Sequence, residues 1–135
     1  MSRQLRPARR RLSSLLDELE DYAGAEEQLR EELQYDAMDV EVRAELGLAL
    51  MKQADFEAAE REFMVVLAME PDHVATLDGF GDLLLIQGRL HEAAHRFRLV
   101  VELEPKHEAS TKLEMMIRGE SEVGPIVTPR GARHL

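Results

Sequence analysis

Two consecutive stretches of 34 residues decide the fold: residues 40–73 read VEVRAELGLALMKQADFEAAEREFMVVLAMEPDH, and residues 74–107 read VATLDGFGDLLLIQGRLHEAAHRFRLVVELEPKH. Aligned without a gap, the two stretches repeat residues of the same kind at the same positions. The pairs are Leu46 and Phe80, Gly47 and Gly81, Leu50 and Leu84, Gln53 and Gln87, Ala59 and Ala93, Phe63 and Phe97, Val66 and Val100, Pro71 and Pro105, and His73 and His107. A fixed period of this length indicates stacked copies of one structural unit.

Apolar residues inside each copy recur at steps of three and four, as at Leu46 and Leu50, which places them on one face of a helix. The pattern predicts helices over 40–53, 56–69, 74–87 and 90–103. Asp39 and Asp72 are the expected N-caps of the first and third of these helices, and Gly88 is the expected residue just past the third.

The two copies resemble the tetratricopeptide-repeat (TPR) family, whose repeat has the same length of 34 residues. With Val40 as position 1, the small residues that the family places at positions 8 and 20 are Gly47 and Ala59. The large residue of position 24 is Phe63, and the proline of position 32 is Pro71. The second copy repeats this set, so the resemblance covers residues 40–107.

The copies depart from the family at position 4, where an aromatic residue is frequent, because Arg43 and Leu77 stand there. A weaker copy precedes them, with helices expected near 7–20 and 23–35, and a capping helix follows, in which Glu114 is a charge at a position that is otherwise apolar. The resemblance implies an all-α solenoid of antiparallel helix pairs with about seven helices. The expected divisions are a flexible N-terminus at 1–5, a divergent repeat at 6–39, repeats at 40–73 and 74–107, a capping helix at 108–118 and a flexible tail at 119–135. Docking of Ile126 and Val127 onto a groove is the alternative for the tail.

The composition excludes several classes of protein. The 135 residues carry a net charge of −10, which argues against a general nucleic-acid binder. The absence of Cys excludes disulfides and thiolate metal sites. We expect no secretory signal and no insertion in a membrane, because the chain has neither an apolar leader nor an apolar run long enough to cross a bilayer. The protein is therefore interpreted as cytoplasmic, and its preference for Arg over Lys suggests a bacterial source.

In the TPR family the first helix of each repeat lines a concave groove, and its positions 2, 5, 9, 12 and 13 bind the partner. Carried over position by position, the resemblance implies a set of binding residues in this chain. They are Glu41, Ala44, Leu48, Met51 and Lys52, then Ala75, Asp78, Asp82, Leu85 and Ile86, and in the capping helix Lys112 and Met116. The apolar members suit a peptide or helix with apolar anchors, and the acids suit a Lys or Arg beside them. Packing between repeats is the alternative role for the apolar residues, and ordinary solvated surface for the acids.

The family's carboxylate clamp, which grips acidic C-terminal peptides of chaperones, uses Asn, Lys and Arg in the groove. This chain contains no Asn, and the corresponding positions are acidic, so a ligand of that kind is not expected.

Two short motifs compete with this interpretation. His91-Glu92-Ala93-Ala94-His95 matches the H-E-x-x-H pattern of zinc proteases. However, the same helix of the first copy has no His, and Arg98 and Val101 stand where the metzincin extension needs Gly and His. Glu114 follows at a plausible distance for a third ligand, but on the neighbouring capping helix, so no metal site is predicted. The basic segment Arg9-Arg10-Arg11 is able to contact an acidic partner, a membrane lipid or a nucleic acid, but we interpret it as a solvated face or as the neutraliser of the acidic helix that follows.

We therefore expect a non-catalytic protein that binds another protein, as an adaptor, an assembly factor or a small chaperone, with no cofactor. Type III secretion chaperones are similar in size, acidity and repeat count. Self-association, as a homodimer or a larger scaffold, is the alternative from a different class. A zinc hydrolase that uses His91, Glu92 and His95 is a remote third.

Overall fold

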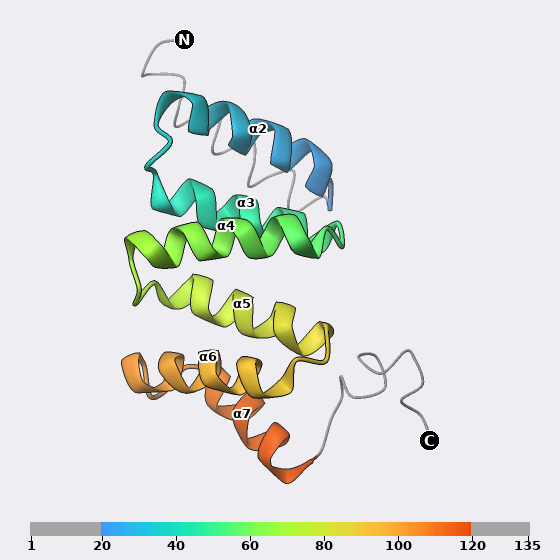
Figure 1. Cartoon of the computed structure of the whole chain (residues 1–135), viewed down its shortest axis with the longest axis vertical. Helices are drawn as coiled ribbons and strands as arrows, with labels where there is room; N and C mark the ends of the chain where they lie inside the picture. Colours follow the sequence, from blue (N-terminus) through green and yellow to red (C-terminus); the bar gives the residue numbers. More distant parts are fainter. Residues whose placement is uncertain (1–19, 120–135) are drawn as a thin grey trace. The chain divides into compact units, whose positions relative to one another are not determined.

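The computed structural model describes residues 20–119, which form six α-helices and no strand (Figure 1). In chain order the helices are α2 (Tyr22–Tyr35), α3 (Val40–Lys52), α4 (Phe56–Met69), α5 (Val74–Ile86), α6 (Leu90–Leu103) and α7 (Ala109–Arg118). The all-helical class is confirmed, and each helix expected within this range begins and ends within one residue of its predicted bounds. The helix expected at 7–20, the segment 1–5 and nearly all of the tail lie outside the described residues.

The described residues divide into two compact units between Pro71 and Asp72. Unit 1 contains α2, α3 and α4, and α3 packs against both of the other helices (Figure 1). Its core is made by the apolar faces that the periodicity predicts. The fully buried side chains are Ala25 and Leu29 of α2, Val42, Leu46 and Leu50 of α3, and Ala59, Phe63 and Val66 of α4.

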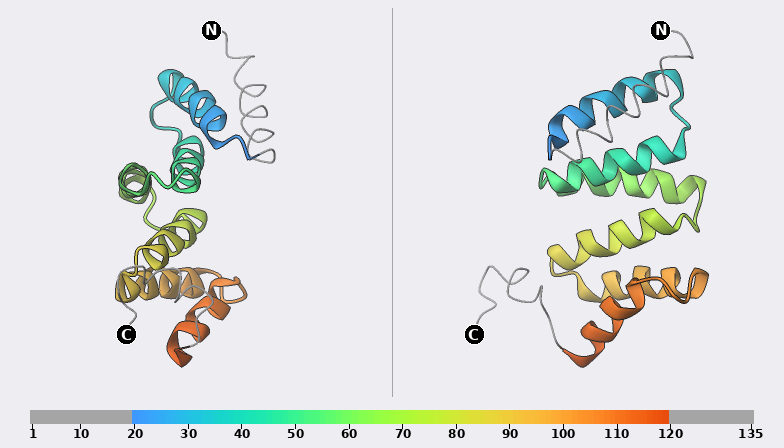
Figure 2. Two further views of the ribbon diagram at one scale, coloured as in Figure 1. Left: turned by 90° about the vertical axis from the view of Figure 1, so that its right-hand side faces the viewer. Right: turned by 180° about the vertical axis from the view of Figure 1, so that it is seen from behind.

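Unit 2 contains α5, α6 and α7, and α6 packs against both neighbours (Figure 2). Three short apolar faces meet in its core. The buried side chains include Leu77, Phe80, Leu83 and Leu84 of α5, Ala93, Phe97 and Val100 of α6, and Ala109 of α7. Burial of these faces, rather than helix propensity, provides most of the free energy that holds such short helices.

Each unit contains one close helix crossing at a glycine. A methyl group placed on Gly47 would lie 2.5 Å from Cε1 of Phe63, which is closer than carbon atoms pack, and the ring of Phe97 crowds Gly81 in the same way. Both rings are fully buried and have no room to withdraw. The expectation that these glycines permit close approach of two helices is confirmed.

The two copies fill repeat position 4 with different chemistry. In unit 1 the Arg43 guanidinium donates from Nη1 to Glu62 Oε1 at 2.9 Å and from Nη2 to the carbonyl oxygen of Ala37. In unit 2 the same position is Leu77, which is buried, and the residue in place of Glu62 is Arg96. Its guanidinium lies 4.6 Å from the centre of the Phe80 ring. An ion pair and an apolar contact therefore replace the usual aromatic residue.

The helix starts confirm one predicted cap and correct another. Asp39 caps α3, because its carboxylate accepts from the backbone N–H of Val42. The prediction of Asp72 as the N-cap of α5 is wrong: the N-cap is His73, whose Nδ1 accepts from the N–H of Thr76. The imidazole lies one residue closer to the helix and offers a lone pair in the place of a carboxylate.

Three turn residues that each precede a second helix share one backbone conformation at a spacing of 34 residues. Glu20, Ala54 and Gly88 have φ values of 63°, 65° and 77°, in the left-handed region that favours glycine. After α3 the N–H of Asp55 donates to the carbonyl of Leu50, and after α5 Arg89 donates to Leu84 in the same way. Gly88 thus ends α5 as predicted, and Gly119, with φ 78°, ends α7.

We expect Gly47→Ala to destabilise unit 1 by about 1–3 kcal/mol, although alanine favours helix, because the new methyl group collides with a ring that cannot move. Chemical denaturation followed by circular dichroism measures the loss. In a double-mutant cycle, Phe63→Leu should recover part of it. Equal losses for Gly47→Ala in the presence and the absence of the Phe63 ring would show that the crossing is not the cause.

Ala54→Gly should raise the free energy of unfolding by about 0.5–1 kcal/mol, because it relieves a left-handed alanine while adding some freedom to the unfolded chain. Gly88→Ala, at the same place in the next repeat, should lower it. Each of the two substitutions is the control for the other when both are measured in one thermal-unfolding series. Shifts of the same sign for both substitutions would contradict the backbone argument.

Candidate partner-binding surfaces

The predicted binding residues of unit 1 lie on α3 but differ in exposure. Glu41 and Lys52 are exposed, and Leu48 and Met51 are half-buried. Ala44 is buried, with 4% of its surface exposed. Ala44 therefore packs inside the unit and is not available to a partner, whereas the other four side chains are accessible.

Lys52, at the end of α3, is placed by α2. Its ammonium lies 5.9 Å from the centre of the Tyr22 ring, which attracts a cation weakly. The neighbouring Gln53 donates from its amide nitrogen to Glu26 Oε1 at 2.9 Å and to the carbonyl of Ala49 at 3.2 Å. These contacts join the start of α2 to the end of α3. They also fix the cation at one edge of the surface.

The predicted residues of unit 2 are similarly mixed. Ala75 is exposed, Ile86 is 37% exposed, and Met116 of α7 is half-buried. Leu85 is buried, with 7% exposure, so it belongs to the core and the expected apolar patch lacks this member. Ile86 and Met116 are the accessible apolar side chains among the predicted residues of this unit.

Asp78, Asp82 and Lys112, three predicted binding residues, form one charged cluster. The Lys112 ammonium donates to Asp78 Oδ1 at 3.1 Å and to the two carboxylate oxygens of Asp82 at 2.9 and 3.2 Å. The same nitrogen lies 5.3 Å from the centre of the buried Phe97 ring. The acids of α5 are therefore already paired with a lysine of α7, and the cluster keeps a net charge of −1.

Desolvation and charge pairing shift the pKa values of Asp82 and Lys112 in opposite directions, and a different one prevails at each residue. Burial raises the pKa of Asp82 above its usual value and outweighs the lowering by the hydrogen bond and charge of Lys112, and the carboxylates of Asp78 and Glu108 raise it further. At Lys112, burial lowers the pKa, but the hydrogen bonds and charges of Asp82 and Asp78 outweigh it, so the pKa is raised overall. The cluster therefore favours the charged form of Lys112, whereas burial disfavours the charged form of Asp82.

Lys112 follows Asp78 by 34 residues and Asp82 by 30, so the pairing joins equivalent positions of two first helices. The spacing of 34 residues in the sequence indicates that Lys112 and Asp78 occupy equivalent positions, and all three residues are predicted binding residues, but their pairing with one another is not predicted from the sequence. The sequence interpretation treats the acids as a charge open to a partner. The structure gives them an internal partner instead.

The H-E-x-x-H residues lie on the exposed side of α6. His91, Glu92 and His95 are all exposed, and Glu92 forms an ion pair with Arg89 at 2.8 Å. The hydrogen bond from Arg89 lowers the pKa of Glu92, which makes its carboxylate a weaker base. Within residues 20–119, no group of three or more His, Cys, Asp and Glu side chains could hold a metal ion.

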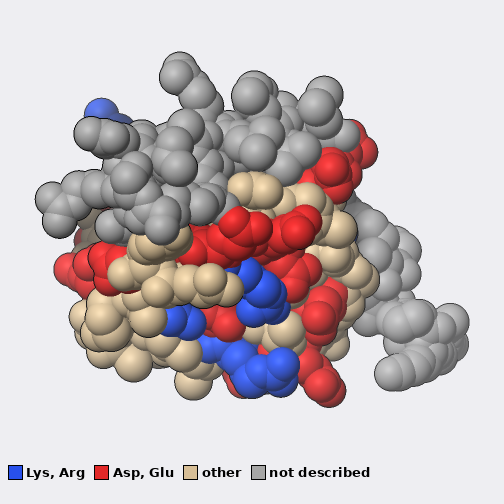
Figure 3. Space-filling view, turned by 90° about the horizontal axis from the view of Figure 1, so that it is seen from above, with Lys and Arg blue, Asp and Glu red and all other residues tan. Residues whose placement is uncertain are grey.

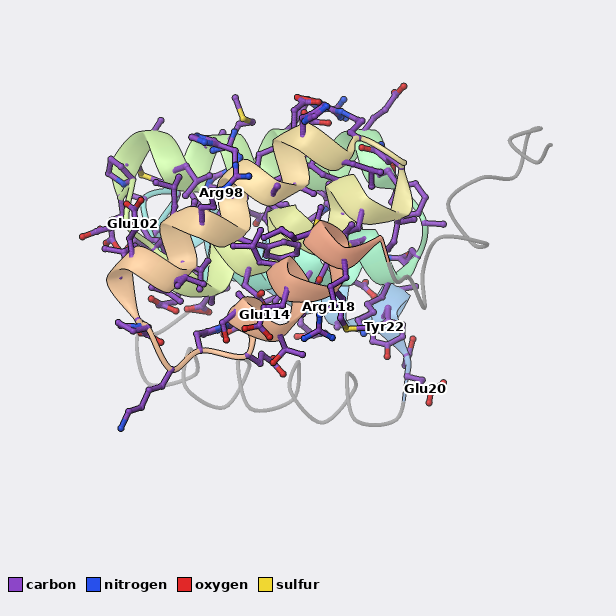
Figure 4. All side chains as sticks on the ribbon, turned by 90° about the horizontal axis from the view of Figure 1, so that it is seen from below. Glu20, Tyr22, Arg98, Glu102, Glu114 and Arg118 are labelled. Atoms are coloured by element: carbon purple, nitrogen blue, oxygen red, sulfur yellow. The ribbon has the colours of Figure 1, made fainter. Side chains whose placement is uncertain are left out.

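Two charged side chains of α7 face the solvent. Glu114 and Arg118 are exposed and project from α7 on the side away from α6 (Figure 4). The interpretation of Glu114 as a residue of a solvent-facing side agrees with this placement. On α6, Arg98 and Glu102 are exposed in the same way (Figure 4).

Charge is distributed unevenly over the described surface. Seen from above, the coloured part shows acidic groups around a smaller basic group (Figure 3). One acid of α2 does not contribute to this surface, because Glu32 is buried. The basic segment Arg9–Arg11 lies outside the described residues. No helix within residues 20–119 is long and apolar enough to cross a membrane.

The Glu26 carboxylate should make the stability of unit 1 depend on pH. The hydrogen bond from Gln53, followed by Arg30, lowers its pKa from 4.5 despite partial burial. A lowered folded pKa stabilises above the ordinary value and stops doing so as the pH falls through the folded value. We expect Glu26→Gln to lower the melting temperature at pH 7, and the difference from wild type to disappear as the pH falls through the lowered pKa of Glu26. Glu27→Gln, an exposed neighbour, is the control, and a constant gap for Glu26→Gln across this range would contradict the linkage.

The sequence matches no protein-family model and no curated protein. Solved structures do match the fold. The first TPR of Spaghetti (RPAP3), bound to the HSP90 peptide SRMEEVD, superposes with a TM-score of 0.79 at 18% identity, over 88% of this chain and 95% of that one. The TPR domain of Arabidopsis OM64 also gives 0.79, at 16% identity, over 86% and 96%. The repeat period, the glycine crossings and these superpositions agree: the chain has the tetratricopeptide-repeat fold.

Proposed function

We propose that the chain is a non-catalytic module that binds a peptide or helical segment of another protein through the first helices of its repeats. These are α3 in unit 1 and α5 in unit 2. The observation that carries the proposal is the presence on these helices of accessible apolar side chains beside charges. Met51 lies next to Lys52, and Ile86 lies one turn from Asp82. Apolar anchors with charged neighbours are typical of helix and peptide recognition.

The charges favour a partner with basic rather than acidic residues. The cluster of Asp78, Asp82 and Lys112 keeps a net charge of −1, Glu41 is exposed, and the whole chain carries −10. The peptide SRMEEVD in the RPAP3 structure is acidic and belongs to that protein. The absence of Asn and the acids on α5 argue against a ligand of the same kind here.

In this proposal the protein acts in the cytoplasm as an adaptor, an assembly factor or a small chaperone. Self-association through the same surfaces is the alternative, supported by the exposed apolar side chains Ile86 and Ile117. It predicts a mass that grows with concentration in light scattering. The binding module predicts a constant mass until the partner is added.

Paired substitutions test the proposed surfaces. Met51→Glu on α3 and Ile86→Glu on α5 alter the first helices, while Met64→Glu on α4 and Leu90→Glu on α6 are matched controls, exposed by 50% each. Partner proteins captured from the native host's lysate by wild type should be retained by both controls. Met51→Glu and Ile86→Glu should each retain about tenfold less, as expected for a lost anchor.

Circular dichroism must first show that all four variants keep the wild-type helix content. Loss of the partner in the controls but not in Met51→Glu and Ile86→Glu would move the binding surface to the second helices. Equal capture by every variant would refute both surfaces.

A further inference from the structure

α7 packs against α6, and one of its side chains, Lys112, reaches across to α5. Lys112 alone supplies the ion pairs that reach Asp78 and Asp82 across the helices, and its ammonium also covers the Phe97 ring. The three charged side chains retain 17–37% of their surface in contact with solvent. Partly exposed ion pairs of this kind are screened by salt and contribute little individually. The ion pairs of Lys112 therefore orient α7 on α5 but contribute little to the free energy that holds it there.

The rest of α7 adds little to this attachment. Of its ten residues only Ala109 is buried, whereas α5 has eight buried residues among thirteen. The side chain of Glu108 forms no cap, although His107 Nδ1 accepts from the N–H of Ala109 at 3.0 Å, and Ile117 is 73% exposed. Helices with few buried contacts open locally at a free energy well below that of global unfolding. We therefore expect α7 to leave unit 2 without unfolding α5 and α6.

Departure of α7 would leave a surface with a definite chemistry. Asp78 and Asp82 would lose the cation that they share. The positions that Lys112 occupies near the Phe97 ring and that Ala109 occupies in the core would become vacant. Two neighbouring carboxylates beside an aromatic ring attract a cationic side chain.

We propose that α7 occupies in cis a helix-binding surface of α5 and α6, and that a partner helix with a Lys or Arg in the place of Lys112 displaces it. The proposal rests on the proposed function and names its ligand. The ligand is an amphipathic helix with a small residue three positions before the cation and an apolar residue four positions after it. Ala109, Lys112 and Met116 have this spacing in α7. The fold then contains its own competitor for the partner.

Hydrogen exchange of the full chain tests the release of α7. Lys112→Gln removes the charge and keeps a side chain of similar length, while Lys106→Gln changes an exposed lysine in the preceding turn. Exchange of the α7 amides should rise about fivefold or more in Lys112→Gln, with α5 and α6 unchanged, and stay as in wild type in Lys106→Gln and Lys112→Arg. Unchanged α7 exchange in Lys112→Gln overturns the proposal, and so does a joint rise in α5 and α6, because α7 would then be part of the core.

A peptide probe tests the surface itself. A labelled peptide with the sequence of residues 108–119 should bind the Lys112→Gln chain about tenfold more tightly than wild type, since α7 no longer competes. The same peptide with Gln in place of its lysine should bind at least about tenfold more weakly. Equal binding to both chains, equal binding of both peptides or no binding would each refute the proposal.

Light scattering tests whether the α7 of a second copy of the chain, rather than a partner helix, occupies the surface. A wild-type dimer that Lys112→Gln converts to a monomer would show that the α7 of a second copy fills the surface, and the partner-helix proposal would fall. The peptide experiment does not use the natural partner. Its failure therefore leaves the substitution test of the proposed function intact, and failure of that test leaves the peptide result interpretable.

Discussion

The contact between a glycine on the first helix of a repeat and a phenylalanine ring on the second controls both units. Gly47 with Phe63 and Gly81 with Phe97 bring two backbones so close that a single methyl group would not fit. This approach fixes which residues of each helix face inward and which remain at the surface. The accessible positions of α3 and α5, from which the binding surfaces are built, follow from it.

Charged residues then distinguish two units that have the same backbone plan. Arg43 with Glu62 in unit 1 and Leu77 with Arg96 in unit 2 occupy equivalent places. The Asp78, Asp82 and Lys112 cluster belongs to unit 2 alone, because Ala44 and Leu48 stand in unit 1 at the places of Asp78 and Asp82. Shape is therefore repeated while charge is not, and a partner able to recognise unit 2 has no equivalent site on unit 1.

Much of the fold was predictable because a 34-residue period, helical spacing and turn residues all indicate the same structure. The site was less predictable. Family positions identify the face on which Ala44 and Leu85 lie, but not how deeply neighbouring side chains cover them. The cap at His73 was missed because a carboxylate stood beside it, and Lys112 was missed as a partner of Asp78 because pairing depends on the distance between helices. Depth and pairing are properties of packing, which periodicity does not encode.

The turns at Glu20, Ala54 and Gly88 reach one backbone conformation with three different residue types. At Ala54 and Gly88, where helices are described on both sides, the geometry of the turn is therefore imposed by those helices and not by the residue in it. Such a position can drift in sequence without altering the architecture, as long as the helix pair supplies enough free energy to hold it. A chain without turn glycines can therefore still form this architecture, whereas the helix crossings at Gly47 and Gly81 have no room for a side chain.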